Sequence, residues 1–350
     1  MKTLGWIGIG RLGIVQMAIG AIVVLTTSTL NRVMVVELAL PAMLPGALVA
    51  FYYAIQLMRP NWGYRSDSGG SRTPWIIGGM AVLAAGGLAA TLGTVLLETN
   101  RMGGLAVSVL GFALIGVGTG AAGTSLLALL ATATAPERRA AAATITWLMM
   151  IFGIAATAGI VGALLDPYSH ARLVRIVALV AASTVVVSAL AMWGVERGLT
   201  GLPTREDRPA PFLEAFAEIW AEARARRFAI FVFLSMTAYF MQELILEPFA
   251  GHVFGFTPGQ STSMAGLQNG GVFLGMLTVG IAASGLRIGS LKMWTVAGCI
   301  GSAAALVSIG LAGLVGPPAP LLPLVFALGV FNGVFAVAAI GSMMQLAGEG

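Results

Sequence analysis

The chain has 350 residues, of which 58% are hydrophobic and only 9% are charged, with a formal net charge of +5. So few polar residues cannot cover a soluble domain of this length, and a mean hydropathy of +0.92 excludes that class. Apolar runs of about 18 or more residues recur, which predicts an all-α, polytopic membrane protein. A β-barrel would need short alternating segments instead.

The apolar runs predict about ten membrane spans. In chain order they are Leu12–Leu30, Leu38–Met58, Pro74–Leu97, Leu105–Thr132, Ala140–Leu165, Leu173–Val195, Phe228–Leu246, Met264–Ser284, Leu291–Val315 and Leu321–Leu346. One polar segment, residues 196–227, divides them. The sequence therefore predicts a first half of six spans in residues 1–195 and a second half of four spans in residues 228–350.

The polar segment between the halves has an apolar face. Phe212, Phe216, Ile219 and Trp220 recur at helical spacing, and acidic residues occupy the other faces. This pattern is typical of an amphipathic helix lying along a membrane surface. A plain linker helix explains it equally well.

The lysines and arginines predict the orientation. If the first half has both its ends on one side, that side holds all but four of the 19 basic residues. The four on the opposite side are Arg32, Arg101, Arg172 and Arg175. Basic residues gather in cytoplasmic loops, so we expect a multi-pass protein of the bacterial cytoplasmic membrane with a cytoplasmic N-terminus. The positive charge thereby has an explanation that needs no nucleic acid.

A charged loop, residues 63–72, lies between the second and third predicted spans. Six spans, a long polar segment and further spans resemble the plan of the major facilitator superfamily, whose equivalent loop has the form G-x-x-x-D-x-x-G-x-[RK]. Gly63, Asp67, Gly70 and Arg72 match it. The resemblance implies a conformational latch in which the carboxylate contacts helix ends or an arginine. An ordinary solvated turn is the alternative.

The resemblance to this superfamily is incomplete. The loop between the eighth and ninth spans, "GLRIGSLK", contains Arg287 and Lys292 but no acid. The chain has ten predicted spans, whereas the superfamily usually has twelve. We therefore interpret the second half as truncated.

Ionisable residues near the membrane are few, and burying them in lipid is costly. Two groups fall at the same predicted depth, at the outer ends of the first and seventh spans. Asn31, Arg32 and Glu37 form one group, and Glu243 and Glu247, which share a helix face, form the other. We predict that they converge in a periplasmic polar cluster in which Arg32 pairs with a glutamate of the seventh span. Glu37 is a competing partner, and simple interfacial anchoring is the alternative.

Catalysis has little support in the sequence. No cluster of histidines and carboxylates has metal-ligand spacing, and no D-x-x-x-D motif for a magnesium-bound diphosphate is present. Cys299 is the only cysteine, so no disulfide or cysteine-based metal site can form within one chain. We expect a protein that is not an enzyme and that holds no metal.

Three stretches of the sequence point to a particular family. "TLNRVMVVELALPA" at residues 29–42, "RSD" at residues 65–67 and "LEPFAGHVFGFTPGQST" at residues 246–262 resemble the PucC family. The resemblance extends over essentially the whole chain. Members of that family occur in phototrophic bacteria, are implicated in assembling light-harvesting complexes, and are in some cases labelled subunits of bacteriochlorophyll synthase.

The resemblance implies a function for this chain. We expect an assembly factor that shields bacteriochlorophyll or delivers it to light-harvesting polypeptides in the membrane, with the pigment as non-covalent cargo and bacteriochlorophyll synthase as a further partner. A facilitator-type transporter of pigment or another amphiphile, or a synthase-associated subunit, is the alternative. The candidate pigment ligands are His252, Gln268 and Asn269.

Overall fold

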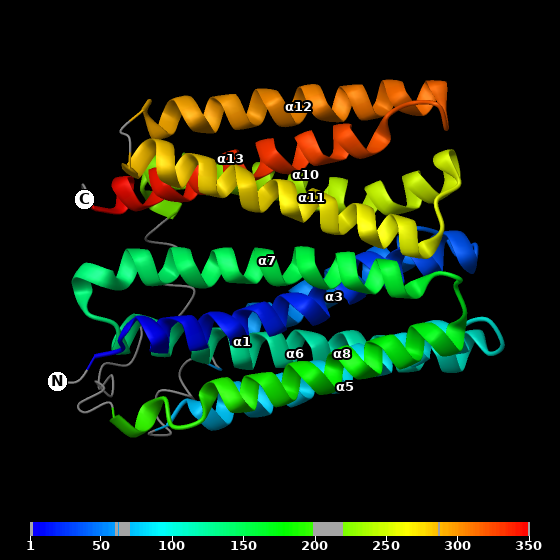
Figure 1. The fold of residues 1–350 in the computed structure, drawn as a ribbon, viewed down its shortest axis with the longest axis horizontal. Helices are drawn as coiled ribbons and strands as arrows, with labels where there is room; N and C mark the ends of the chain where they lie inside the picture. Colours follow the sequence, from blue (N-terminus) through cyan, green and yellow to red (C-terminus); the bar gives the residue numbers. More distant parts are fainter. Residues whose placement is uncertain (1–2, 60–61, 63–70, 199–219, 286–287, 349–350) are drawn as a thin grey trace.

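The computed structural model of the protein describes residues 3–59, 62, 71–198, 220–285 and 288–348. Within these ranges all regular structure is helical, as predicted (Figure 1). Nine helices in the described ranges are long and apolar enough to cross a membrane, and a tenth, Met43–Met58, is shorter. The protein is therefore a multi-pass, all-α membrane protein.

The first span is longer than its apolar run predicts. Helix α1 (Trp6–Val24) continues through the π-helical turn η1 (Leu25–Thr29), the short α2 (Leu30–Arg32) and a second π-helical turn, η2 (Val33–Glu37). The result is one rod over residues 6–37. In it, the hydroxyls of Thr26 and Thr27 donate to carbonyls of the preceding turn, which is the local competition that accompanies bent or widened helices.

The second span is correspondingly shorter than predicted. Helix α3 (Met43–Ile55) ends in the 3₁₀ turn η3 (Gln56–Met58), and it begins five residues after the predicted start at Leu38. Ala39 has a φ of 49° and Pro41 follows it, so the backbone reverses direction there and cannot be helical. The predicted boundary at Leu38 was wrong for this reason.

The remaining helices follow the predicted order. They are α5 (Thr73–Leu96), α6 (Arg101–Ala133), α7 (Arg139–Leu165), α8 (His170–Met192), α10 (Ala223–Phe254), α11 (Pro258–Val279), α12 (Leu291–Val315) and α13 (Leu321–Gly348). Helix α10 begins before the predicted start of the seventh span at Phe228. Half of the segment predicted to be amphipathic, residues 212–219 of 212–227, lies outside the described residues.

The helices pack in two groups that meet along one seam. In the first group α5 packs on α6 and α8, and α1 packs on α7 and α8. In the second group α13 packs on α11 and α12, and α10 packs on α11. The seam between the groups is formed chiefly by α7 against α11 (Figure 1).

Glycines allow the close helix packing. A side-chain carbon added at Gly118 of α6 would come within 2.4 Å of the Leu83 backbone nitrogen on α5, and one at Gly275 of α11 within 2.1 Å of the Val330 carbonyl on α13. Both glycine-rich stretches that offer small surfaces in the sequence, residues 116–123 and 266–275, are thus engaged in helix contacts.

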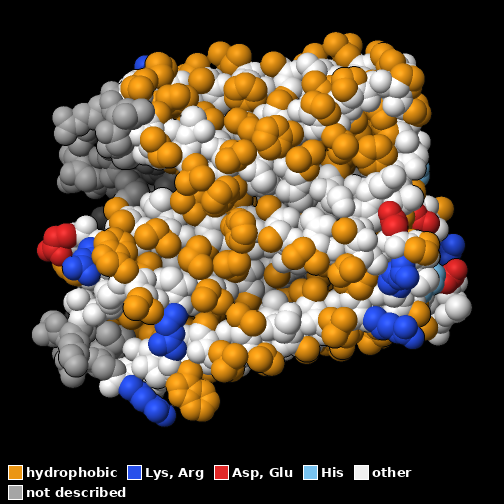
Figure 2. All heavy atoms as spheres, in the orientation of Figure 1, with side chains coloured by type: hydrophobic (Ala, Val, Ile, Leu, Met, Phe, Trp, Pro, Cys, Tyr) orange, Lys and Arg blue, Asp and Glu red, His pale blue; other side chains and the backbone are white. Residues whose placement is uncertain are grey.

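The surface is consistent with a membrane setting. Figure 2 shows hydrophobic side chains over the middle of one face, with charged side chains gathered toward the two ends of the helices. Large exposed apolar residues include Leu179, Phe233 and Leu314. Such a broad apolar surface fits contact with lipid.

Candidate functional site

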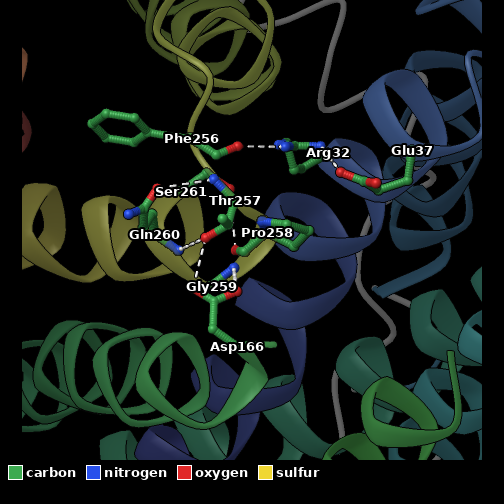
Figure 3. Close-up of polar contacts among 9 residues, drawn as sticks. All are labelled: Arg32, Glu37, Asp166, Phe256, Thr257, Pro258, Gly259, Gln260 and Ser261. Atoms are coloured by element: carbon green, nitrogen blue, oxygen red, sulfur yellow. Dashed lines mark hydrogen bonds and ion pairs between the residues drawn. The ribbon is translucent and has the colours of Figure 1, made fainter. Parts of the chain in front are cut away.

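The end of the first rod carries a buried arginine that joins the two helix groups. The Arg32 side chain is only 2% exposed, and its Nη1 donates to Glu37 Oε1 over 2.9 Å. Its Nη2 donates to the Phe256 carbonyl, which follows α10, over 2.7 Å (Figure 3). We call Arg32, Glu37 and Phe256 the Arg32 junction. Its ion pair is with Glu37, the competing partner considered from the sequence.

A glycine on α10 makes room for this arginine. A carbon added at Gly251 would lie 2.7 Å from Arg32 Nε and 2.8 Å from its Cζ, so the guanidinium lies against bare backbone. Glu247 lies one turn earlier on the same helix face, 3% exposed, and neither of its carboxylate oxygens has a hydrogen-bond partner in the described residues. Among the described residues, no ion pair joins Arg32 to Glu247 or to Glu243.

Two further polar contacts cross between the groups beside the junction. Asn31 Nδ2 donates to the Leu244 carbonyl of α10 over 2.8 Å. The hydroxyls of Thr29 and Thr262 lie 3.2 Å apart, both fully buried. Buried polar groups are stabilising only when they are paired, so these contacts fix the register of the first rod against α10 and α11.

Asp166 ties the end of α7 to the start of α11. Its carboxylate accepts from the Thr257 hydroxyl over 2.6 Å and from the Gly259 backbone nitrogen over 3.3 Å. Thr257 is the N-cap of α11 and forms a capping box with Gln260 (Figure 3). A carboxylate at a helix N-terminus interacts favourably with the unpaired N–H groups there. The Arg32 junction and Asp166 therefore join the two groups at the same end of the bundle.

Glu243 faces a different environment from Glu247. It lines a cavity of about 560 Å³ between α3 and α10, which is bounded at one side by Thr27. We call this cavity the α3–α10 groove. Tyr53 of α3 and Phe240 of α10 meet there with ring centroids 5.2 Å apart. The periplasmic cluster predicted from the sequence is thus divided: Arg32 and Glu37 pair at the junction, while Glu243 opens on the groove.

The three residues considered as pigment ligands do not come together. His252 is exposed in the last turn of α10, and Gln268 is buried on α11. Asn269 Nδ2 donates to the Ala265 carbonyl of its own helix over 3.0 Å. None of the three lines the groove. Among the described residues no group of three or more His, Cys, Asp or Glu side chains could hold a metal ion.

The opposite end of the first group has a polar cluster of its own. The Arg72 guanidinium donates to the Thr132 hydroxyl near the end of α6. The Glu196 carboxylate, just after α8, accepts from the backbone nitrogens of Arg72 and Thr73 over 2.9 and 3.2 Å and from the Ser71 hydroxyl. Of the predicted latch only Arg72 is described, because Gly63, Asp67 and Gly70 lie outside the described residues.

The contact of Glu196 with the start of α5 predicts a pH dependence. Burial would raise the pKa of this carboxyl, but the hydrogen bonds from Ser71, Arg72 and Thr73 outweigh burial and lower the pKa below its ordinary 4.5. Because the folded-state pKa is the lower one, the stabilisation is present above pH 4.5 and is lost as the pH falls through the folded value.

We therefore expect Glu196→Gln to lower the unfolding temperature at pH 7 and to do so less as the pH falls below 4.5. The loss should be under about 1 kcal/mol, because the carboxylate is partly exposed to solvent. Thermal unfolding in detergent at pH 7 and at progressively lower pH measures it. A deficit that is the same at every pH would contradict the assignment.

Sequence patterns alone missed three residues that form contacts at the two ends of the bundle. In the sequence, Asp166 and Glu196 look like ordinary acidic residues of loops. Gly251 is one residue of the stretch 246–262 that resembles the PucC family. A carboxylate that follows an apolar run is a weak signal, because the hydroxyl and N–H groups that donate to it lie 91 or more positions away in the chain. Only the packing of the helices reveals these contacts.

Comparison with known proteins identifies the family. The family model described as "PUCC protein" matches residues 29–350. The chain belongs to the PucC family. It is 63% identical over 348 residues to the "Bacteriochlorophyll synthase 44.5 kDa chain" of Rhodobacter capsulatus, covering 99% of this chain and 81% of that protein. It is 29% identical to "Protein PucC" of the same species, over 96% of this chain and 76% of the relative.

The fold of this PucC-family chain is similar to that of a solved transporter. A crystal structure of a mutant of the peptide transporter POT, in complex with sulfate, matches with a TM-score of 0.68 over 97% of this chain and 83% of that chain. A second structure, of POT in complex with sulfate, matches with a TM-score of 0.69. At 16% and 15% identity these matches concern the fold alone, and they confirm the all-α helical bundle predicted from the sequence.

Proposed function

We propose that this protein is a non-enzymatic assembly factor that shields bacteriochlorophyll or delivers it to light-harvesting polypeptides. The single observation that carries the proposal is membership of the PucC family over nearly the whole chain. The proposal includes a location in the bacterial cytoplasmic membrane with the N-terminus in the cytoplasm, which the unequal distribution of arginines supports.

The α3–α10 groove supports this function physically. Its volume of about 560 Å³ lies within the range of about 300–1,000 Å³ typical of small-molecule sites. Its lining is mostly apolar, and one carboxylate, two threonines and a tyrosine supply the polar atoms. Such a groove suits an apolar molecule with one polar centre and does not suit a sugar or peptide.

Two other functions have some support. The likeness of the fold to a peptide transporter favours a facilitator that moves pigment or another amphiphile across the membrane. The name of the relative that is 63% identical favours an association with bacteriochlorophyll synthase. Both functions involve the same pigment. In the first the pigment crosses the membrane, and in the second the protein acts together with the enzyme that makes it.

Deleting the gene and recording the absorption spectrum of the membranes tests the proposal. We expect the antenna absorption bands to fall while pigment synthesis continues. The deletion removes the delivery of bacteriochlorophyll to the antenna polypeptides and leaves the enzymes of its synthesis intact. Normal antenna bands would contradict the proposal. Loss of all bacteriochlorophyll with accumulation of its unesterified precursor would favour a role in synthesis, and flux of pigment in proteoliposomes would favour transport.

A further inference from the structure

The two walls of the α3–α10 groove differ in size and stiffness. On α3 the wall is small at Gly46 and Ala50 and aromatic at Tyr53. On α10 most of the lining residues are large, among them Met236 and Phe240. Methionine adapts its shape to a ligand, and small residues allow a flat one to lie close to a helix.

Gly46 lines the groove at a point where there is room for a side chain. A carbon added there would meet nothing within 4 Å, so the helix has no packing need for glycine at this point. This separates Gly46 from glycines such as Gly118, whose added carbon would strike a neighbouring backbone. A side chain at position 46 would enter the groove without disturbing the fold.

Among the described residues that line the groove, Glu243 is the one with a charged side chain. It is only partly exposed, and within the described residues it takes part in no ion pair or hydrogen bond. An ionised carboxylate in such an apolar setting is unfavourable unless a proton or a bound cation neutralises it, and a cationic ligand centre is one such partner. Its oxygens are hard ligands, which prefer a hard cation such as magnesium over a soft one.

We propose that the α3–α10 groove holds the cargo as a flat magnesium-centred macrocycle, with Glu243 as the axial ligand of the metal. A carboxylate oxygen donates its electron pair to magnesium and displaces a solvent ligand, and nothing is oxidised or reduced. The ring lies between the small wall at Gly46 and Ala50 and the large wall at Met236 and Phe240. The inference rests on the proposed function, since it names the seat of that cargo.

The binding of metal-containing and metal-free pigment to the purified protein tests this assignment. Bacteriochlorophyll and its metal-free form share ring and tail, so their difference in affinity isolates the bond to magnesium. We expect the wild type to prefer the metal-containing pigment by about tenfold or more, and Glu243→Leu to lose that preference while still binding both forms weakly. Titration followed by visible absorption and circular dichroism gives the affinities.

Two further variants distinguish the effect of the Glu243 carboxylate from the effect of the space in the groove. Gly46→Leu should weaken both pigments alike, because it fills the groove and leaves the carboxylate in place. Gly78→Leu is the matched control: Gly78 lies on the exposed face of α5, also has nothing within 4 Å of an added carbon, and does not line the groove. It should bind both pigments as the wild type does.

The remaining outcomes show whether the assignment of Glu243 alone, or the proposed function as well, is wrong. A wild type that binds both pigments equally, or a Glu243→Leu variant that keeps the preference, would overturn the assignment of Glu243 and leave the cargo role standing. A wild type that binds neither pigment would overturn both. Native mass spectrometry that finds a phospholipid in the groove which pigment does not displace would overturn the inference in favour of a lipid site.

Discussion

Replacing Arg32 with glutamine is expected to destabilise the protein by about 3 kcal/mol, as for removal of one partner of a buried ion pair. The side chain is 2% exposed and forms hydrogen bonds to Glu37 and to the Phe256 carbonyl. Without it, a carboxylate and a carbonyl lose their donor at the contact between the two helix groups. The end of the bundle that Arg32 and Asp166 hold together should open more readily.

A double-mutant cycle identifies the partner of Arg32. Because Glu37 is its ion-pair partner in the structure, Arg32→Gln combined with Glu37→Gln should cost less than the sum of the two single changes. Arg32→Gln and Glu247→Gln should show weaker coupling, since no ion pair joins those two described residues. Thermal unfolding in detergent gives the free energies, and Arg101→Gln, at an exposed arginine, serves as the control. A loss for Arg32→Gln no larger than that of the control would contradict the role of the junction.

The fold was predictable from the sequence because its main determinant is local. Twenty or so apolar residues in a row form a helix in lipid wherever they occur, so the number and order of spans follow from composition. The ends of the spans were less predictable. The π-helical turns that extend the first rod to Glu37, and the reversal at Ala39, depend on side-chain hydrogen bonds and backbone angles that hydropathy does not report.

The site was predictable only in part, for a related reason. The sequence pointed to Asn31, Arg32 and Glu37 because ionisable residues near a span are rare. It could not choose the partner of Arg32, since that depends on how α10 packs against the first rod and on the bare backbone at Gly251. The groove at Glu243 was likewise not visible, because its walls come from helices almost 200 positions apart.

Replacing Gly162 with alanine is expected to destabilise the seam between α7 and α11 by about 1–3 kcal/mol, the usual range for overpacking. A carbon at this position would lie 2.5 Å from the Ser263 backbone nitrogen and 2.7 Å from the Gly259 carbonyl. Backbone cannot rotate away as a side chain can, so the two helices must separate. The seam joins the two helix groups, and its separation should lower the unfolding temperature of the protein as a whole.

Gly159 offers a matched control on the same helix, since a carbon added there meets nothing within 4 Å. Both changes raise helix propensity by about 1 kcal/mol, so Gly159→Ala should be neutral or stabilising, and the difference between the variants isolates the contact with α11. Gly266→Ala approaches the same seam from α11, 2.7 Å from the Gly159 nitrogen, and should resemble Gly162→Ala. If one separation of the helices relieves both clashes, Gly162→Ala with Gly266→Ala will cost less than their sum. Equal unfolding temperatures for Gly162→Ala and Gly159→Ala would show that the helices of the seam are not in close contact.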